Sequence, residues 1–144
     1  LHTILIADLA KNLARYVRRG KDQISDIMIG LIEQGAQVTA VDYNTCVDKR
    51  VGLNDWLQDI CTEYDAILTP ATIGEAPVGL EATGDPVFCS TWSYLGAPAV
   101  TVPLMQGEND MPLGVQLVSY RGDDARLLRN ARWLAEEVVR HSDD

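Results

Sequence analysis

Apolar positions repeat every three or four residues through the first third of the chain, which is the period of an α-helix with one buried face. Segment 3–17 shows this spacing and ends in Lys/Arg-rich sequence, which suits the negative end of a helix dipole. Segment 24–35 carries a second stripe, and Gly35 at its end is expected to be a C-cap. The two stripes consist of Ile4, Ala7, Leu13, Tyr16 and Val17, and of Ile24, Ile27, Met28, Leu31 and Ile32.

A third helical stretch begins at a polar boundary. Thr39 and Asp42 have the Thr-x-x-acid spacing of a capping box, in which side chains satisfy the free N–H groups of the first turn. Apolar residues continue near helical spacing as far as Tyr64, and Gly52 is the expected break. The sequence therefore predicts one long or broken helix before Tyr64.

Beyond this point the pattern changes to short apolar runs bounded by Pro and Gly, which is typical of buried strands. Three strands are predicted, at 66–69, 99–102 and 114–119. The Gly-, Asn- and Asp-containing segment between the last two favours a hairpin. The first two are joined through a short helix at 87–96 and resemble a βαβ crossover, for which parallel strands and a right-handed connection are expected.

The C-terminal segment 123–139 is a clear amphipathic helix, with Asp123 as its expected N-cap. Together these elements predict an α/β fold, in which a partial mixed sheet of about three strands is packed by helices. Residues 1–144 are predicted to form a single domain or fragment, mainly helical over 1–64 and α/β over 65–144. A sheet of this size leaves edges that need to be covered.

Composition narrows the possible partners and compartments. The formal net charge of −9 argues against binding to nucleic acid or anionic lipid, because both require excess Lys and Arg. The three cysteines, Cys46, Cys61 and Cys89, are widely spaced, which disfavours zinc sites and disulfide frameworks and fits a reducing cytoplasm. No apolar run approaches a membrane span and no signal peptide is recognised. Leu1 in place of Met suggests a processed chain or a piece of a longer one.

Candidate catalytic groups are sparse. A nucleophilic Ser, Cys or Thr needs a nearby base, and the histidines, His2 and His141, lie near the two ends of the chain. Cys89 lies beside Ser90 with no base near it in sequence, so a helix-buried thiol is expected. The lysines lie in charged helical contexts at Lys11, Lys21 and Lys49. No catalytic residue, metal site or cofactor is predicted.

Three other residues have two interpretations each. Asp85 precedes Pro86 and either caps the following helix or points into a pocket. Trp92 and Tyr94 either pack against the sheet or line a substrate cavity. The turn 110–114 lacks the glycine pattern of a phosphate-binding loop.

Four segments, in the same order and at the same spacing, resemble the C-terminal part of the amidase signature family. They are "YDAILTPATIGEAP" (64–77), "GDPVFCSTWSYLGAPAVTVP" (84–103), "MPLGVQLVS" (111–119) and "DDARLLRNARWL" (123–134), with "GAQVTAVDY" (35–43) fitting the preceding helix start. The resemblance covers nearly the whole chain, although residues 1–34 are generic. It implies that the predicted strands belong to a larger mixed sheet, and that loop 71–85 and the helix after it border an acyl-binding pocket.

The same resemblance implies a Ser–cis-Ser–Lys triad set in a Gly/Ser-rich segment, with backbone N–H groups holding the oxyanion. This chain contains no Gly-Gly-Ser-Ser run. Its serines, Ser25, Ser90, Ser93, Ser119 and Ser142, stand in other contexts. No triad residue is therefore carried over, and the chain alone is predicted to be inactive.

The sequence thus predicts the C-terminal segment of an amidase-family hydrolase that acts on a small carboxylic amide. Substrate-binding residues are expected at Thr72, Glu75, Asp85 and Trp92. The expected partner is either a missing N-terminal catalytic half or a second copy of the chain, and the expected location is the cytoplasm.

Three alternatives remain open. The first is a non-catalytic interaction module derived from the family, whose exposed sheet edge and apolar face need a partner. The second is a fragment of the glutamine-hydrolysing component of an amidotransferase, although the stretch 83–92 looks more like general amidases. The third, a small independent enzyme using Cys89 or Ser90, is disfavoured because no base is placed for it.

Overall fold

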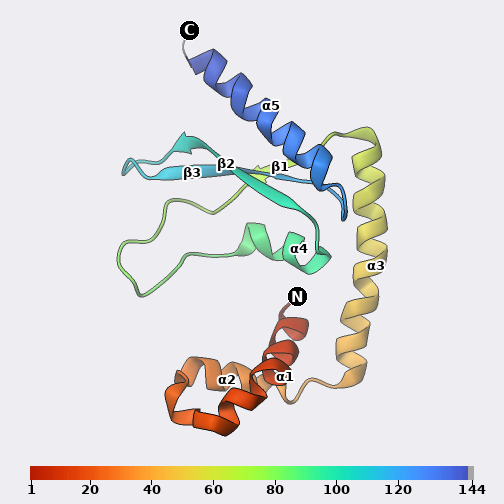
Figure 1. The fold of residues 1–144 in the computed structure, drawn as a ribbon, viewed down its shortest axis with the longest axis vertical. Helices are drawn as coiled ribbons and strands as arrows, with labels where there is room; N and C mark the ends of the chain where they lie inside the picture. The colour runs from red at the N-terminus through yellow and green to blue at the C-terminus, as the bar shows by residue number, and fades with distance from the viewer. Residues whose placement is uncertain (143–144) are drawn as a thin grey trace. The chain divides into compact units, whose positions relative to one another are not determined.

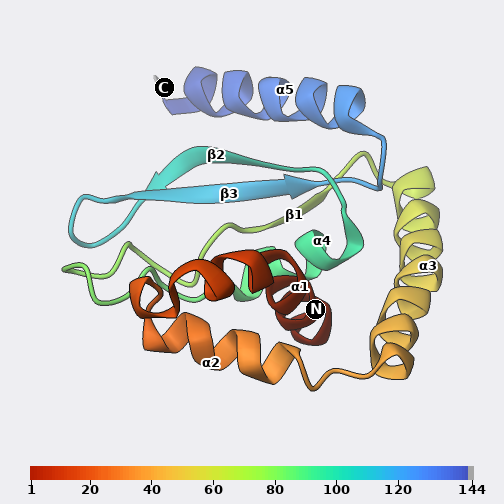
Figure 2. The ribbon, with the colours of Figure 1, turned by 60° about the horizontal axis from the view of Figure 1, so that its bottom comes forward.

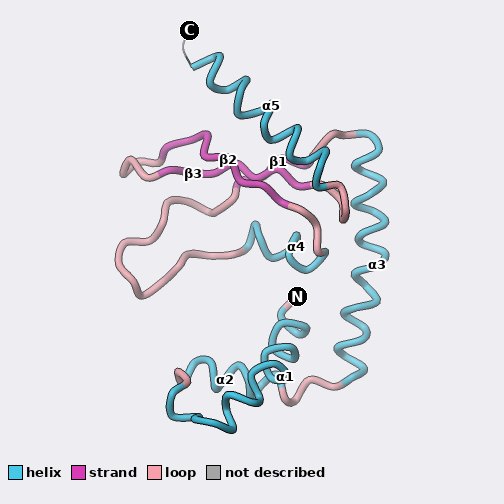
Figure 3. Tube along the Cα trace, viewed as in Figure 1, coloured by secondary structure: helices cyan, strands magenta, loops and turns pink. Residues whose placement is uncertain are grey.

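The computed structural model describes residues 1–142, and the chain divides into two compact units, Leu1–Gly52 and Leu53–Asp144. In chain order the elements are α1 (His2–Gly20), the 3-10 turn η1 (Lys21–Gln23), α2 (Asp26–Gly35), α3 (Ala40–Glu63), β1 (Ile67–Pro70), α4 (Val87–Leu95), β2 (Ala99–Gln106), β3 (Pro112–Val118) and α5 (Asp124–Ser142) (Figures 1 and 3). The helices and strands predicted from the sequence are all present. Their bounds differ from the predicted ones by a few residues, because ladder bonds extend β2 and β3 beyond the apolar runs.

The first unit contains a closely packed helix pair. α1 and α2 pack against each other, with Ile6 and Ile32 buried. Gly35 ends α2, but the C-cap prediction is wrong, because the next residue, Ala36, keeps right-handed backbone angles of φ −67° and ψ −15°. What requires glycine is the close approach of the helices, since a Cβ on Gly35 would overlap the backbone carbonyl of Ile6.

α3 begins at the predicted cap, but it lacks the predicted internal break. The Asp42 N–H donates to Thr39 Oγ1 at 3.1 Å, and the Thr39 hydroxyl donates to Asp42 Oδ2 at 2.7 Å. The break expected at Gly52 is wrong, because α3 is one continuous helix across it. A single glycine costs a helix about 1 kcal/mol relative to alanine, which is too little to interrupt a ladder of this length.

The second unit is built on a three-stranded sheet in the order β1-β3-β2, with both pairs antiparallel. The α/β fold class and the three strands are confirmed. The parallel direction expected for the first two strands is confirmed: β1 and β2 are both antiparallel to β3, which lies between them and forms hydrogen bonds with both. A crossover fixes the direction of two strands, whereas it does not fix which strand fills the gap between them.

The sheet has a helix on each face, with α5 on one and α4 on the other (Figures 1 and 2). Successive residues of a strand point to opposite faces. On the α5 face, Leu117 packs with Leu127 and Ala131. On the α4 face, Ile67 contacts the buried cluster of Leu57, Cys61 and Leu95. The second half of α3 therefore joins α4 beneath the sheet.

The predicted turns are confirmed by backbone geometry. The β2–β3 hairpin closes through the Gly107 N–H, which donates to the Met111 carbonyl at 2.9 Å, and Asp110 takes a positive φ of 62°. α4 ends at Gly96, whose φ of 66° places it in the left-handed region that glycine adopts without steric cost.

Two alanine substitutions in α2 distinguish helix propensity from helix contact. Gly35→Ala should lower the free energy of unfolding by about 1–3 kcal/mol, because the added methyl group forces α1 and α2 apart. Gly30→Ala is the matched control: an added Cβ there meets no atom within 4 Å, so the variant should be more stable by up to about 1 kcal/mol. Urea unfolding followed by circular dichroism at the helix band measures both, and changes of the same sign would contradict the close contact.

Candidate functional site

A pocket of about 350 Å³ opens where β1 ends, between the β2–β3 hairpin and the start of α4. Its lining includes Thr72, Ile73, Phe88, Met105, Leu113 and Gly114. Except for Thr72, these side chains are apolar or absent. The site can therefore enclose an apolar group beside a single hydroxyl.

Close backbone packing forms one side of this pocket. The Ala71 N–H donates to the Gly114 carbonyl at 3.0 Å, which continues the β1–β3 pairing beyond the end of β1. A Cβ on Gly114 would overlap the side chain of Thr101 and press on that of Ala71. Glycine at this position lets the first residue of the loop lie directly against β3.

Two of the predicted site residues lie on the loop that follows β1. Thr72 Oγ1 donates to the Gly74 carbonyl at 2.7 Å and borders the pocket. Glu75 accepts from Asn109 with both carboxylate oxygens: from the backbone N–H at 2.8 Å and from Nδ2 at 2.6 Å. These bonds, the side-chain one first, lower the pKa of Glu75 below its ordinary value.

The other two predicted residues are held in structural contacts. Asp85 Oδ1 accepts from the Val87 N–H at 2.9 Å, so the capping interpretation of Asp85 is confirmed. Trp92 is half-buried against the cluster of Leu57, Cys61 and Leu95. Among the four, only Thr72 borders the pocket, and a substrate contact by any of them stays a prediction.

The nucleophiles near the pocket have structural partners. Cys89 is exposed, so the expectation of a helix-buried thiol is wrong; its Sγ lies 3.6 Å from the Ala71 carbonyl. Ser90 donates to the Pro86 carbonyl at 2.9 Å, the usual bond of a serine to the preceding turn. The chain's three lysines all lie in the first unit.

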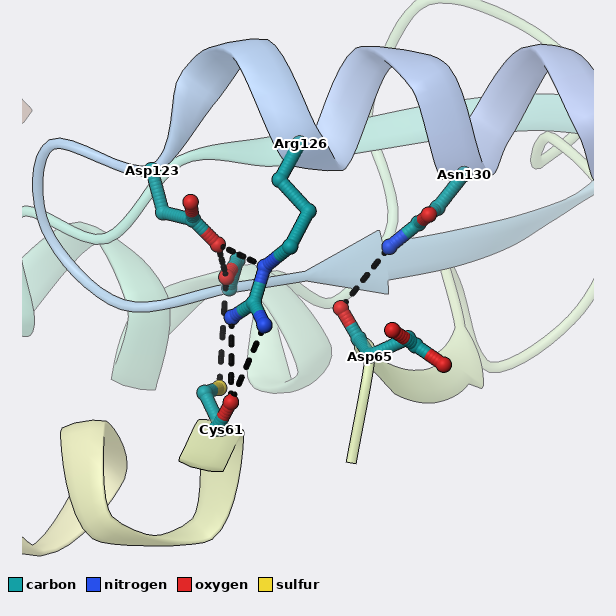
Figure 4. Close-up of polar contacts among 6 residues, drawn as sticks. Cys61, Asp65, Asp123, Arg126 and Asn130 are labelled. Atoms are coloured by element: carbon teal, nitrogen blue, oxygen red, sulfur yellow. Dashed lines mark hydrogen bonds and ion pairs between the residues drawn. The ribbon is translucent and has the colours of Figure 1, made fainter. Parts of the chain in front are cut away.

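A cluster at the start of α5, which we call the Arg126 clasp, consists of Cys61, Ser119, Asp123 and Arg126. Asp123 Oδ2 accepts from the Ser119 hydroxyl and from Arg126 Nε, both at 2.6 Å. The Arg126 guanidinium also donates twice to the Cys61 carbonyl, at 3.1 Å (Figure 4). Nearby, Asn130 Nδ2 donates to the Asp65 carbonyl at 2.8 Å. The clasp thus ties α5 to the end of β3 and to the last turn of α3.

The electrostatics of the clasp are those of a structural ion pair. Burial alone would raise the pKa of Asp123, but the bonds from Ser119 and Arg126 outweigh it, and the net pKa is lowered. The hydrogen bond to Asp123 likewise raises the pKa of Arg126. Ser119 is fully buried, so its hydroxyl cannot meet a substrate even though it has a carboxylate beside it.

Sequence reasoning assigned Asp123 to an N-cap and missed this cluster. Asp123 does precede α5, and its carbonyl accepts from the Leu127 N–H. Its carboxylate, however, bonds to Ser119 and Arg126. The spacing Ser-x-x-x-Asp-x-x-Arg at a strand-to-helix junction is the local pattern that could have indicated the bonds among Ser119, Asp123 and Arg126. The Cys61 carbonyl lies 65 residues from Arg126, so the local sequence does not indicate this contact.

The structure shows neither a metal cluster nor a membrane span in the part of the chain that it describes. Across residues 1–142, no three His, Cys, Asp or Glu side chains gather closely enough to hold a metal ion. No helix in the same range combines the length and apolar character that crossing a bilayer requires.

Comparison with known sequences links the chain to one family. The family profile described as Amidase matches residues 4–128. The A subunit of glutamyl-tRNA(Gln) amidotransferase from Thermotoga maritima is 32% identical over 124 residues, which is 82% of this chain and 26% of that protein. The mitochondrial counterpart from Ornithorhynchus anatinus is 26% identical over 95% of this chain and 33% of that protein.

Two solved structures share the fold of this chain. A crystal structure of an amidase superposes with a TM-score of 0.77 at 25% identity, covering 94% of this chain and 34% of the other. The 6-aminohexanoate cyclic dimer hydrolase gives a TM-score of 0.74 at 20% identity over 94% of this chain, a likeness of fold alone. The chain therefore spans between a quarter and a third of the length of the two amidotransferase relatives.

A double-mutant cycle tests the clasp. Asp123→Ala and Arg126→Ala should each lower the free energy of unfolding by roughly 1.5–3 kcal/mol, because each removes a hydrogen bond between charged groups. Their coupling should reach at least about 0.5 kcal/mol. The same cycle on the exposed pair Arg132–Glu136, in the same helix, should give about 0.5 kcal/mol or less. Equal couplings in urea unfolding would contradict a structural clasp.

Lowering the pH should reduce the stability that the clasp contributes. Because the pKa of Asp123 is lower in the folded chain than its ordinary value of 3.8, the carboxylate stabilises the fold above that value, and this stabilisation is lost as the pH falls through it. The stability difference between the unmodified chain and Asp123→Ala should therefore be largest near neutral pH and shrink below about pH 4. A difference that grows on acidification would contradict the shift.

Proposed function

Because the chain belongs to the amidase family, we propose that it forms the substrate-pocket part of an enzyme that cleaves or transfers carboxylic amide C–N bonds. The observation that carries the proposal is the pocket at the end of β1. It is built entirely from segments inside the family match, and the two nucleophiles near it, Cys89 and Ser90, contact main-chain carbonyls.

In this proposal the chain supplies positioning and apolar walls, while an N-terminal part of the enzyme supplies the nucleophile, its base and the oxyanion donors. Holding the acyl group in a fixed wall contributes to rate by orientation. Electrostatic stabilisation of the oxyanion comes from donors outside the 144 residues. Thr72 contacts the substrate, whereas Glu75, Asp85 and Trp92 act by holding the surrounding backbone and helix.

Two reactions fit the family: transfer of the amide nitrogen and hydrolysis of the amide. The two curated relatives are amidotransferase components by name, which supports transfer of amide nitrogen within a complex. The stretch 83–92 and the uncharged lining of the pocket support hydrolysis of a small apolar amide instead. We propose the hydrolase as the first function. We also propose a cytoplasmic location, which the wide spacing of the cysteines supports.

An interaction module is the second candidate. In the described sheet β1 and β2 each pair on one side only, with β3. Unpaired strand edges favour addition of a strand from another chain. The same edges suit the N-terminal part of an amidase, so a measurement of turnover is needed to separate the two functions.

The chain alone should show no amide turnover. The substrates are benzamide, hexanamide and glutamine, and ammonia release is the readout. A chimera in which this chain replaces the matching part of the Thermotoga maritima relative should release ammonia, because the catalytic residues and the pocket are then joined. Circular dichroism establishes that the chimera is folded. A folded, soluble chimera without turnover would favour the interaction module.

Cys89→Ala and Ser90→Ala are the controls for an independent enzyme. Both residues lie outside the proposed chemistry, so both variants of the chimera should keep its rate. Turnover by the isolated chain that disappears on alkylation of Cys89, or in Ser90→Ala, would overturn the proposal and establish a small self-contained enzyme.

A further inference from the structure

We propose that Glu75 is a positioning residue. With Asn109 and Gly107 it forms a latch that holds the loop after β1 against the β2–β3 turn and so fixes the wall of a pocket for an apolar acyl group. This inference rests on the proposed function for the identity of the ligand. The latch itself rests only on contacts within the second unit.

The latch joins segments far apart in the sequence. Glu75 and Asn109 are 34 residues apart, yet both carboxylate oxygens accept from Asn109, at 2.8 Å from the backbone N–H and 2.6 Å from Nδ2. A Cβ on Gly107 would overlap the Glu75 carboxylate. The turn therefore has an open face where the carboxylate lies, and two donors directed at it.

This geometry favours a structural role for Glu75 over a direct contact with substrate. Both of its oxygens already accept from Asn109, in hydrogen bonds of the stronger kind that join a charged to a neutral partner. Its lowered pKa keeps it ionised at neutral pH, which preserves both bonds. Glu75 can still influence a ligand through the residues beside it.

Those neighbours include residues that line the pocket. Ile73 and Gly74, immediately before Glu75, line one side, and Met105, two residues before Gly107, lines another. The latch therefore joins the loop after β1 to the β2–β3 turn, close to the residues of each segment that line the pocket. Opening it would free Ile73 to move away from Met105.

Beyond Glu75 the loop makes little contact with the rest of the unit. Val78 is fully exposed and Leu80 is 99% exposed. Further along, the Val87 N–H donates to Asp85 at the start of α4. Glu75 thus anchors the β1 side of this loop before its exposed tip, which makes its bonds decisive for the position of Ile73.

The lining defines the ligand class. Among residues 1–142, no Asp, Glu, Lys, Arg or His lines the pocket, and its volume of about 350 Å³ lies at the low end of the range for small-molecule sites. An aliphatic or single-ring aromatic acyl group fits this lining. The charged α-amino acid end of glutamine would lose its hydration there without a partner.

Methionine methyl groups provide the probe. The chain has three methionines: Met105 in the pocket wall, Met111 beside the turn and Met28 in the first unit. With ¹³C-methyl-methionine labelling of the whole chain, benzamide and hexanamide should shift the Met105 signal and leave Met28 unchanged. Glutamine should shift neither. A silent Met105 with both apolar amides, or an equal response to glutamine, would overturn the ligand class.

Variants test the latch separately. Glu75→Gln replaces one acceptor oxygen by a donor facing Asn109, and Asn109→Ala removes one donor while leaving the carboxylate intact. Both should weaken the apparent affinity for benzamide several-fold and speed amide hydrogen exchange at residues 107–111. Glu81→Gln makes the same chemical change on the same loop, at an exposed residue, and should match the unmodified chain.

The outcomes separate the latch from the proposed function. Unchanged amide hydrogen exchange at the buried residues Leu117 and Leu127 establishes that the second unit of each variant is folded. Asn109→Ala replaces Glu75→Gln if the latter is not folded. Exchange and affinity equal to those of the Glu81→Gln control would overturn the latch while leaving the proposed function intact. Turnover by the isolated chain would overturn the proposed function and leave the latch result standing.

Discussion

The second unit depends on one constraint, the central position of β3, whose last three residues are buried. This strand pairs with β1 on one edge and β2 on the other. Leu117 is buried against Leu127 of α5 on one face. On the opposite face Gln116 is buried, which is tolerable because its Nε2 donates to Thr69 Oγ1 at 3.3 Å and to the Phe88 carbonyl at 3.1 Å. One strand therefore holds both neighbouring strands and both helices in place.

The segments that line the pocket are held in position by β3. The loop after β1 begins with a bond from Ala71 to Gly114 of β3, and the hairpin turn is the continuation of β3 itself. α4 is attached to β3 through the Gln116 bond to Phe88. Glu75 then closes the arrangement by bonding the loop to Asn109 of the turn. Each wall is thus fixed near its attachment to β3, while the loop tip remains exposed.

The sequence predicted what depends on neighbouring residues and missed what depends on distant ones. The Thr39 cap, the hairpin turn and the end of α4 at Gly96 follow from local chemistry, and all are confirmed. Gly35 was misassigned because its requirement comes from a carbonyl of another helix. The local pattern indicated the parallel direction of β1 and β2, but it did not indicate that β3, the last strand in the sequence, lies between them. The partners of Glu75 and Arg126 are likewise remote, so their residue types alone could not reveal them.

Three carboxylates of the second unit hold backbone segments in place, and this use limits the chemistry they can perform. Asp123, Glu75 and Asp85 each accept bonds from the chain itself, and the first two have lowered pKa values. A general base needs a pKa near the working pH and a proton within reach, whereas the pKa values of Asp123 and Glu75 are lowered and both carboxylates already accept hydrogen bonds. Positioning groups of this kind complement a nucleophile and base supplied elsewhere, which is the division of labour that the proposed function requires of this chain.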